Sequence, residues 1–145
     1  MVYFCGYDSQ VKAWSISDKQ LKYEINQRSA VYDIVIGRKG TPLENRLVSI
    51  GYQCCRISSL ETGAEVKRIE LDSYCWSIAV DKAQTVIAIG TDKKVVFIKT
   101  TNFTNVKEVS LEKRVFSLAF NKRNDCMFAL TNNGEVHSFK FSVSE

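Results

Sequence analysis

The feature that most constrains the fold of this chain is a six-residue apolar motif that occurs three times. It reads VYDIVI at residues 31–36, CWSIAV at 75–80 and VFSLAF at 115–120, so successive copies begin 44 and 40 residues apart. A second motif repeats with similar spacing around Gly6, Gly51 and Gly90. Thr131 occupies the equivalent position in the last module. A period of this length is typical of stacked repeat modules rather than of one irregular domain. Repetition is therefore expected to determine the architecture.

Within each period, short apolar runs rich in Val, Ile, Phe, Tyr and Trp alternate with clusters of Gly, Asp, Asn and Ser. This alternation predicts short strands joined by tight turns, and no apolar stripe indicates a long helix. The two central modules are each expected to hold four strands, near 31–36, 47–51, 54–58 and 65–71, and near 75–80, 85–89, 95–99 and 106–111. Three strands are expected in each terminal module, which brings the prediction to fourteen strands.

The modules show a gradient of polarity from their first strand to their last. The first strand is apolar at nearly every position, which predicts that both of its faces are covered. Its aromatic residues Tyr32, Trp76 and Phe116 are accordingly expected to form core between modules. In the last strand, Glu65 and Lys67 interleave with apolar residues, which predicts a partly solvated outer strand. A buried inner strand and a partly solvated outer strand are typical of a blade of a β-propeller.

Several segments resemble the WD-repeat family. The stretch CRISSLETG at 55–63 is similar to the end of such a repeat, with Ser58 and Ser59 in place of tryptophan and aspartate, while VKAWSIS at 11–17 keeps Trp14. The turn aspartate of the family, six residues earlier, corresponds to Asp8 in the first module. The equivalent positions in two later modules hold Asp92 and Asn133. No Gly-His pair precedes the three inner strands, so the polar network of the family is incomplete here.

The resemblance covers essentially the whole chain and implies one all-β unit, a partial β-propeller of about three and a half four-stranded WD-repeat-like blades. The blades are expected at about 1–28, 29–72, 73–112 and 113–145. The two terminal modules both carry a second and a third strand, so neither completes the other. We therefore expect a segment of a larger propeller, or a chain whose open edges are covered by a partner.

The residues that usually carry catalysis are sparse. His137 is the single histidine and has no cysteine or carboxylate at a spacing typical of a triad or a metal site. No glycine-rich phosphate loop is present, and we predict no enzyme, no catalytic residue, no metal and no cofactor. An odd number of cysteines in apolar runs favours buried thiols in an intracellular protein, cytoplasmic or nuclear. No apolar run is long enough to predict a membrane helix.

Positive charge gives the candidate binding residues. The formal net charge is only +4, too small by itself to indicate a nucleic-acid partner. The resemblance places the loops before each inner strand, and those between second and third strands, on one rim. This rim would carry the partner-binding candidates Arg28, Tyr74, Lys93, Lys94, Lys113 and Arg114. Because Arg38, Lys39, Arg46, Lys122 and Arg123 would decorate the opposite rim, solvated charge on both faces is the favoured interpretation.

The resemblance implies a non-catalytic module that holds other proteins in a complex. Two alternatives remain open from the sequence. One is a nucleic-acid-associated subunit that uses the basic rim. The other is a module that recognises phosphorylated degrons in a ubiquitin-ligase complex through Arg28 and Arg114.

Overall fold

The computed structural model describes residues 1–123 and 125–140, and within these residues the chain is all-β with no helix. None of the described residues therefore belongs to a helix capable of spanning a membrane. The strands, in chain order, are β1 (Val2–Cys5), β2 (Gln10–Ser15), β3 (Gln20–Asn26), β4 (Val31–Ile36), β5 (Arg46–Ser59), β6 (Glu65–Val80), β7 (Val86–Thr91), β8 (Lys94–Lys99), β9 (Thr104–Ser110), β10 (Val115–Phe120), β11 (Cys126–Thr131) and β12 (Val136–Lys140).

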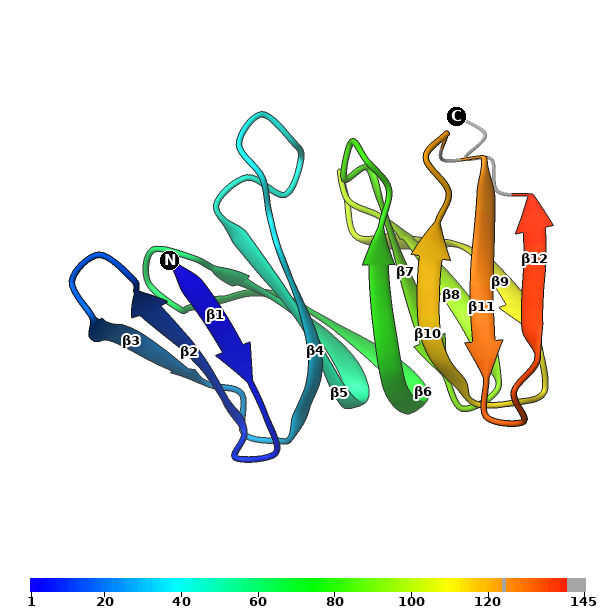
Figure 1. The fold of residues 1–145 in the computed structure, drawn as a ribbon, viewed down its shortest axis with the longest axis horizontal. Coiled ribbons are helices and arrows are strands. Elements are labelled where there is room, and N and C mark those ends of the chain that lie inside the picture. Colours follow the sequence, from blue (N-terminus) through cyan, green and yellow to red (C-terminus); the bar gives the residue numbers. More distant parts are fainter. Residues whose placement is uncertain (124, 141–145) are drawn as a thin grey trace.

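The strands form three antiparallel sheets, none of which closes on itself. Strands β1 to β3 form the first sheet, β4 to β9 the second and β10 to β12 the third, each in chain order. Figure 1 shows the two three-stranded sheets at opposite ends of the molecule, with the six-stranded sheet between them. Because each strand pairs with the next along the chain, hairpin connections build all three sheets.

Two strands of the central sheet are longer than the sequence predicts. β5 joins the strands expected at 47–51 and 54–58, and the chain turns within it at Gln53, whose φ is 56°. β6 joins the outer strand expected at 65–71 to the first strand of the next module at 75–80. The prediction of separate strands is wrong here because Tyr52 pairs with Tyr74, which extends the ladder through both junctions. The expected module boundary at 72–73 therefore lies inside β6.

The core lies between neighbouring groups of strands rather than at one centre. On β7, Ile87 and Ile89 belong to a cluster shared with β5, β6 and β8. The alternate residues Val86 and Ala88 face a second cluster, shared with β8, β10 and β11. A third cluster joins β2 and β3 to β4 and β5. Since successive residues of a strand point to opposite faces, β7 is covered on both sides.

The burial of the strands differs in part from the predicted gradient. The outer strands β3 and β9 are exposed along most of their length, as predicted. The prediction that the first strands are covered on both faces is wrong for β10, where Val115 and Leu118 alone are buried, whereas β4 and residues 75–80 of β6 have no exposed residue. The fully buried strand is β7, with most of β8. Within the described residues the sheets do not close, so the second face of β10 stays largely exposed, although Phe116 there contacts Trp76 and Arg114.

Candidate interaction surface

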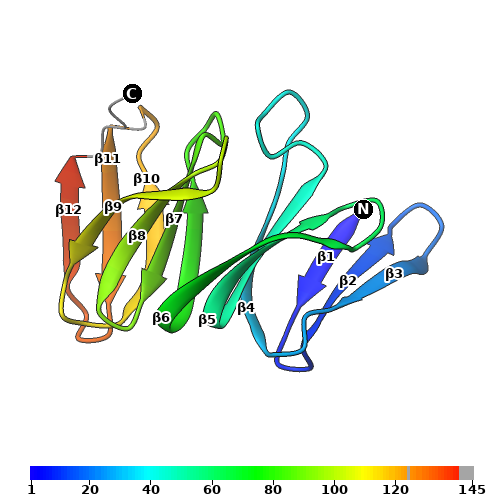
Figure 2. The same ribbon diagram turned by 180° about the vertical axis from the view of Figure 1, so that it is seen from behind.

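One side of the molecule gathers most of the residues singled out from the sequence. The connections β1–β2, β3–β4, β7–β8, β9–β10 and β11–β12, together with the bends of β5 and β6, lie along the lower side in Figure 1 and again in Figure 2 from behind. We call this side the rim. It is the side on which the sequence places the six partner-binding candidates.

A continuous row of aromatic rings runs along the rim from the first sheet to the third. Tyr7, in the β1–β2 connection, meets Tyr32 of β4 edge-on, with ring centroids 5.5 Å apart. Tyr32 then contacts Trp76 of β6 at 5.0 Å, and Trp76 contacts Phe116 of β10 at 6.1 Å. These ring contacts connect all three sheets through side chains.

Two further tyrosines branch from this row. Tyr74 stacks on Trp76 with centroids 5.5 Å apart, and Tyr52 lies 4.6 Å from Tyr74. The exposed fractions are 79% for Tyr7, 49% for Tyr52, 38% for Tyr74 and 46% for Phe116. We call these six residues, Tyr7, Tyr32, Tyr52, Tyr74, Trp76 and Phe116, the aromatic row.

The expectation that Tyr32, Trp76 and Phe116 form buried core is wrong. Phe116 is exposed, and Tyr32 and Trp76 are only half-buried. Their strands turn the flanking residues inward instead, as Val115 on β10 illustrates with no exposed surface. Period-two alternation then directs the aromatic residues to the opposite face, which the open sheets leave accessible to solvent.

Asp92 and Arg114 fix the centre of the row. Trp76 Nε1 donates a hydrogen bond to Asp92 Oδ1 at 2.6 Å, and Arg114 Nε donates to the same oxygen at 3.1 Å. The Arg114 guanidinium carbon also lies 4.4 Å from the Trp76 ring centroid and 5.7 Å from that of Phe116. A cation so close to the face of an indole ring is attracted by its quadrupole. Trp76 is thus held from its edge and from its face.

The three predicted turn residues do not share one role. Asp8 Oδ1 accepts a hydrogen bond from Gln10 N at 3.2 Å, and Asn133 Oδ1 accepts one from the Thr131 hydroxyl, so both serve their own turns. In the β7–β8 turn, Thr91 Oγ1 takes that place and accepts hydrogen bonds from the backbone amides of Lys93 and Lys94. Asp92 is consequently free to bind Trp76 and Arg114 across the rim.

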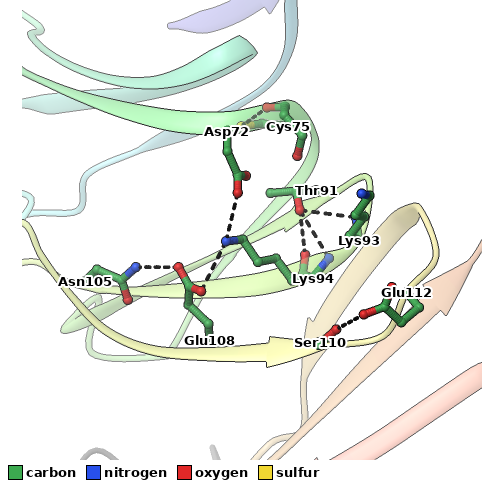
Figure 3. Close-up of polar contacts among 10 residues, drawn as sticks. Asp72, Cys75, Thr91, Lys93, Lys94, Asn105, Glu108, Ser110 and Glu112 are labelled. Carbon is green, nitrogen blue, oxygen red and sulfur yellow. Dashed lines mark hydrogen bonds and ion pairs between the residues drawn. The ribbon is translucent and has the colours of Figure 1, made fainter.

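Lys94 is neutralised by acidic neighbours. Figure 3 shows its ammonium group between two carboxylates, with Nζ 3.1 Å from Glu108 Oε2 and 3.2 Å from Asp72 Oδ2. The hydrogen bond to Glu108, then that to Asp72, raises the pKa of Lys94 above its usual value. Lys93 lines a depression of about 320 Å³ beside Lys94 and Asp72.

The remaining basic candidates are also placed by the structure. Lys113 Nζ forms an ion pair with Glu135 Oε2 at 2.9 Å. Arg28 lies apart from the aromatic row, in a cleft that it shares with Arg56. Its backbone has a φ of 63°, supported by a hydrogen bond from Arg28 N to Asn26 Oδ1 at 2.8 Å. In the structure, Tyr74 and Arg114 both contact Trp76. Lys93 and Lys94 line the same depression, and Arg28 lines a different cleft.

Sequence reasoning missed Tyr7, Tyr52 and Arg56. Arg56 could have been found from the sequence, because it is a charged residue inside the apolar run CCRIS. Tyr52 precedes the residue at which β5 turns, but that turn becomes evident only once β5 is seen as a continuous strand.

Groups suited to metal binding are absent from the part of the chain that the structure describes. His137 lies on β12, as predicted, and its Nε2 is 3.0 Å from Glu135 Oε2. All five cysteines are free thiols, and Cys54, Cys55 and Cys75 are buried. A comparison of the sequence with protein-family models gives no match, and neither does a comparison with curated proteins.

Proposed function

We propose that this chain is a partial β-propeller that acts as a non-catalytic protein-binding module, with the aromatic row as its contact surface. Antiparallel strands joined in chain order, core clusters between successive groups of strands and exposed outer strands support the propeller-like arrangement. The resemblance to WD repeats at 55–63 and 11–17 is consistent with it. The remaining blades, or a partner chain, would cover the open sheets.

The observation that carries the proposal is the exposed aromatic row with Arg114 seated over Trp76. Tyrosine, tryptophan and arginine are the residues that contribute most to binding at protein interfaces. Contiguous exposed apolar surface of this kind marks interaction sites in soluble proteins. The rings also contact one another and Asp92 holds Trp76 in place, so little side-chain freedom is lost when a partner binds.

A nucleic-acid partner is less well supported. Lys94, Lys113 and Arg114 are all paired with carboxylates, so three of the five basic candidates on the rim carry compensated charge. Binding to a phosphate backbone depends on cations that are available to replace counterions.

Site-specific photo-crosslinking tests the proposal. We would place p-benzoylphenylalanine at Tyr74 in the full chain, expressed in its source cells, and at Val106 as an exposed apolar control on β9. We expect a discrete protein adduct from position 74 that is absent from position 106 and is lost when Arg114 is replaced by alanine. Equal adducts from both positions, or adducts with RNA alone, would contradict the proposal.

A further inference from the structure

A cleft of about 270 Å³ lies between the end of β3 and strands β5 and β6, outside the aromatic row. Its wall is unusually rich in arginine, with Arg28, Arg56 and Arg68 opposed by one carboxylate, Glu65. Arg68 Nε is 2.7 Å from Glu70 Oε1, a residue that does not line the cleft. The lining of the cleft thus has three arginines and one carboxylate, with Arg56 and Arg68 in ion pairs with Glu65 and Glu70 and Arg28 contributing the further positive charge.

Arg56 is the central residue of this cleft. Its side chain is only 9% exposed, and its Nη1 donates a hydrogen bond to Gln27 Oε1 at 3.2 Å. Gln27 Oε1 also accepts a hydrogen bond from the Ser49 hydroxyl at 3.3 Å, so the buried amide is held in position. The guanidinium is thus anchored at one nitrogen by a fixed acceptor.

The Nε of Arg56 is buried and has no hydrogen-bond partner among the described residues. Glu65 Oε1 lies 3.7 Å away, which is too far for a hydrogen bond. A buried charged donor without an acceptor is costly, and a guanidinium presents its N–H groups in a fork that fits the oxygens of an oxyanion. Arg56 also lines the cleft, so an oxyanion bound there would supply the acceptor that this donor lacks.

We propose that this cleft binds a phosphate monoester, presented as a phosphorylated side chain of the partner protein. A phosphate group supplies three acceptor oxygens and close to two negative charges, which match the donor of Arg56 and the positive charge of Arg28 and Arg68 at the mouth. The inference rests on the proposed protein-binding function and names the chemistry that the partner brings.

Arginine-detected NMR tests the proposal directly. The Nε–H signals of the full chain are followed during titration with inorganic phosphate and with O-phosphoserine, against sodium chloride at equal ionic strength. We expect a saturable shift of the Arg56 signal with both phosphates and none with chloride. Arg28→Gln should weaken phosphoserine binding by about tenfold. The matched control Arg38→Gln removes an exposed charge away from the cleft and should leave binding unchanged.

Each alternative outcome is informative. Arg56→Gln risks the fold because the residue is buried, so Arg68→Gln serves as a second variant at the mouth. Identical titrations for Arg28→Gln and Arg38→Gln, or shifts that follow ionic strength alone, overturn the site. Binding of inorganic phosphate without binding of phosphoserine overturns the assignment to a modified partner. A single-stranded RNA oligonucleotide that competes far better than phosphoserine points to nucleic acid instead. Arg114→Ala should abolish the crosslink from position 74 but leave these titrations unchanged, because Arg114 does not line the cleft, and this separates the inference from the proposed function.

Discussion

At the scale of single residues, Asp92 shows how one carboxylate changes its role with context. The repeat pattern places it as a turn residue, yet Thr91 accepts the hydrogen bonds of that turn. Asp92 instead accepts hydrogen bonds from Trp76 on β6 and from Arg114 just before β10. It therefore connects the central sheet to the third sheet at the rim.

Replacing Asp92 by alanine should lower the free energy of unfolding by about 2 kcal/mol, because two charge-assisted hydrogen bonds are lost and Arg114 loses its counter-charge. Denaturant unfolding followed by tryptophan fluorescence measures the change. Asp72→Ala is the matched control, since that side chain is 71% exposed and has one surface ion pair, so its removal should cost about 0.5 kcal/mol or less. Equal losses in the two variants would show that Asp92 has no special role.

The buried thiols predict that native protein is alkylated selectively. Burial raises the pKa of Cys75 to about 12, and burial also raises the pKa of Cys55. At pH 8 only about one Cys75 thiol in ten thousand is then ionised, and the thiolate is the reactive form. Native protein treated with iodoacetamide should be alkylated at the half-buried Cys126 but not at Cys55 or Cys75. Mass spectrometry measures the labelling, and denatured protein should react at all five positions. Similar native rates at Cys75 and Cys126 would contradict this.

At the scale of strands, the repeated glycines have a packing reason in two of three modules. A Cβ on Gly51 would lie 2.4 Å from the carbonyl oxygen of Ala30. A Cβ on Gly90 would lie 2.4 Å from Ser77 Oγ and 2.7 Å from Val115 Cγ1. In each case the second strand approaches the segment that leads into, or forms, a neighbouring first strand. Gly6 has no such neighbour, since its nearest contact would be Asp8 Oδ1 at 3.6 Å.

Gly51→Ala should therefore destabilise the protein by about 2 kcal/mol or more, because the backbone of Ala30 cannot move aside as a side chain would. Gly6→Ala occupies the equivalent place in the repeat and should be tolerated within about 0.5 kcal/mol. Thermal unfolding by circular dichroism compares the two variants with the parent chain. Indistinguishable melting temperatures would show that the spacing of the glycines has no packing basis.

The sequence predicted the strands well and their continuity poorly. Period and turn residues indicated where apolar runs begin and end, and ten of the twelve observed strands correspond to single predicted ones. They did not reveal that β6 runs on through Asp72 and Ser73, because polar residues in that position resemble a loop. The pairing of Tyr74 with Tyr52, distant in the chain, continues the ladder beyond this stretch.

The candidate site was predicted less well for a related reason. The rim position implied by the resemblance drew attention to Lys94 and Lys113, but their acidic partners Glu108 and Glu135 become neighbours through strand pairing. Trp76 was identified as a structural residue, and its half-exposed position depends on which face of β6 remains uncovered. Burial of that kind is a property of several strands together, and no local pattern specifies it.

At the scale of the whole molecule, open sheets predict uneven protection. β7 is buried along its full length and pairs with strands on both sides, whereas β12 pairs with β11 alone among the described residues and is exposed at alternate positions. Hydrogen exchange measured by NMR should therefore be slower by at least about a hundredfold for the amides of β7 than for those of β12. The exposed outer strand β9 should fall between them. Uniform protection across β7 and β12 would indicate that the chain is closed or covered in solution.

The course of β6 has a mechanical consequence. Its first half pairs with β5 and its second half with β7, so one uninterrupted segment of backbone ties the two halves of the central sheet together. If the chain were stretched from its ends, all three sheets would carry the same force, and the smaller three-stranded sheets would be expected to open before the six-stranded one. The central sheet would then be the last part of the molecule to unfold under load.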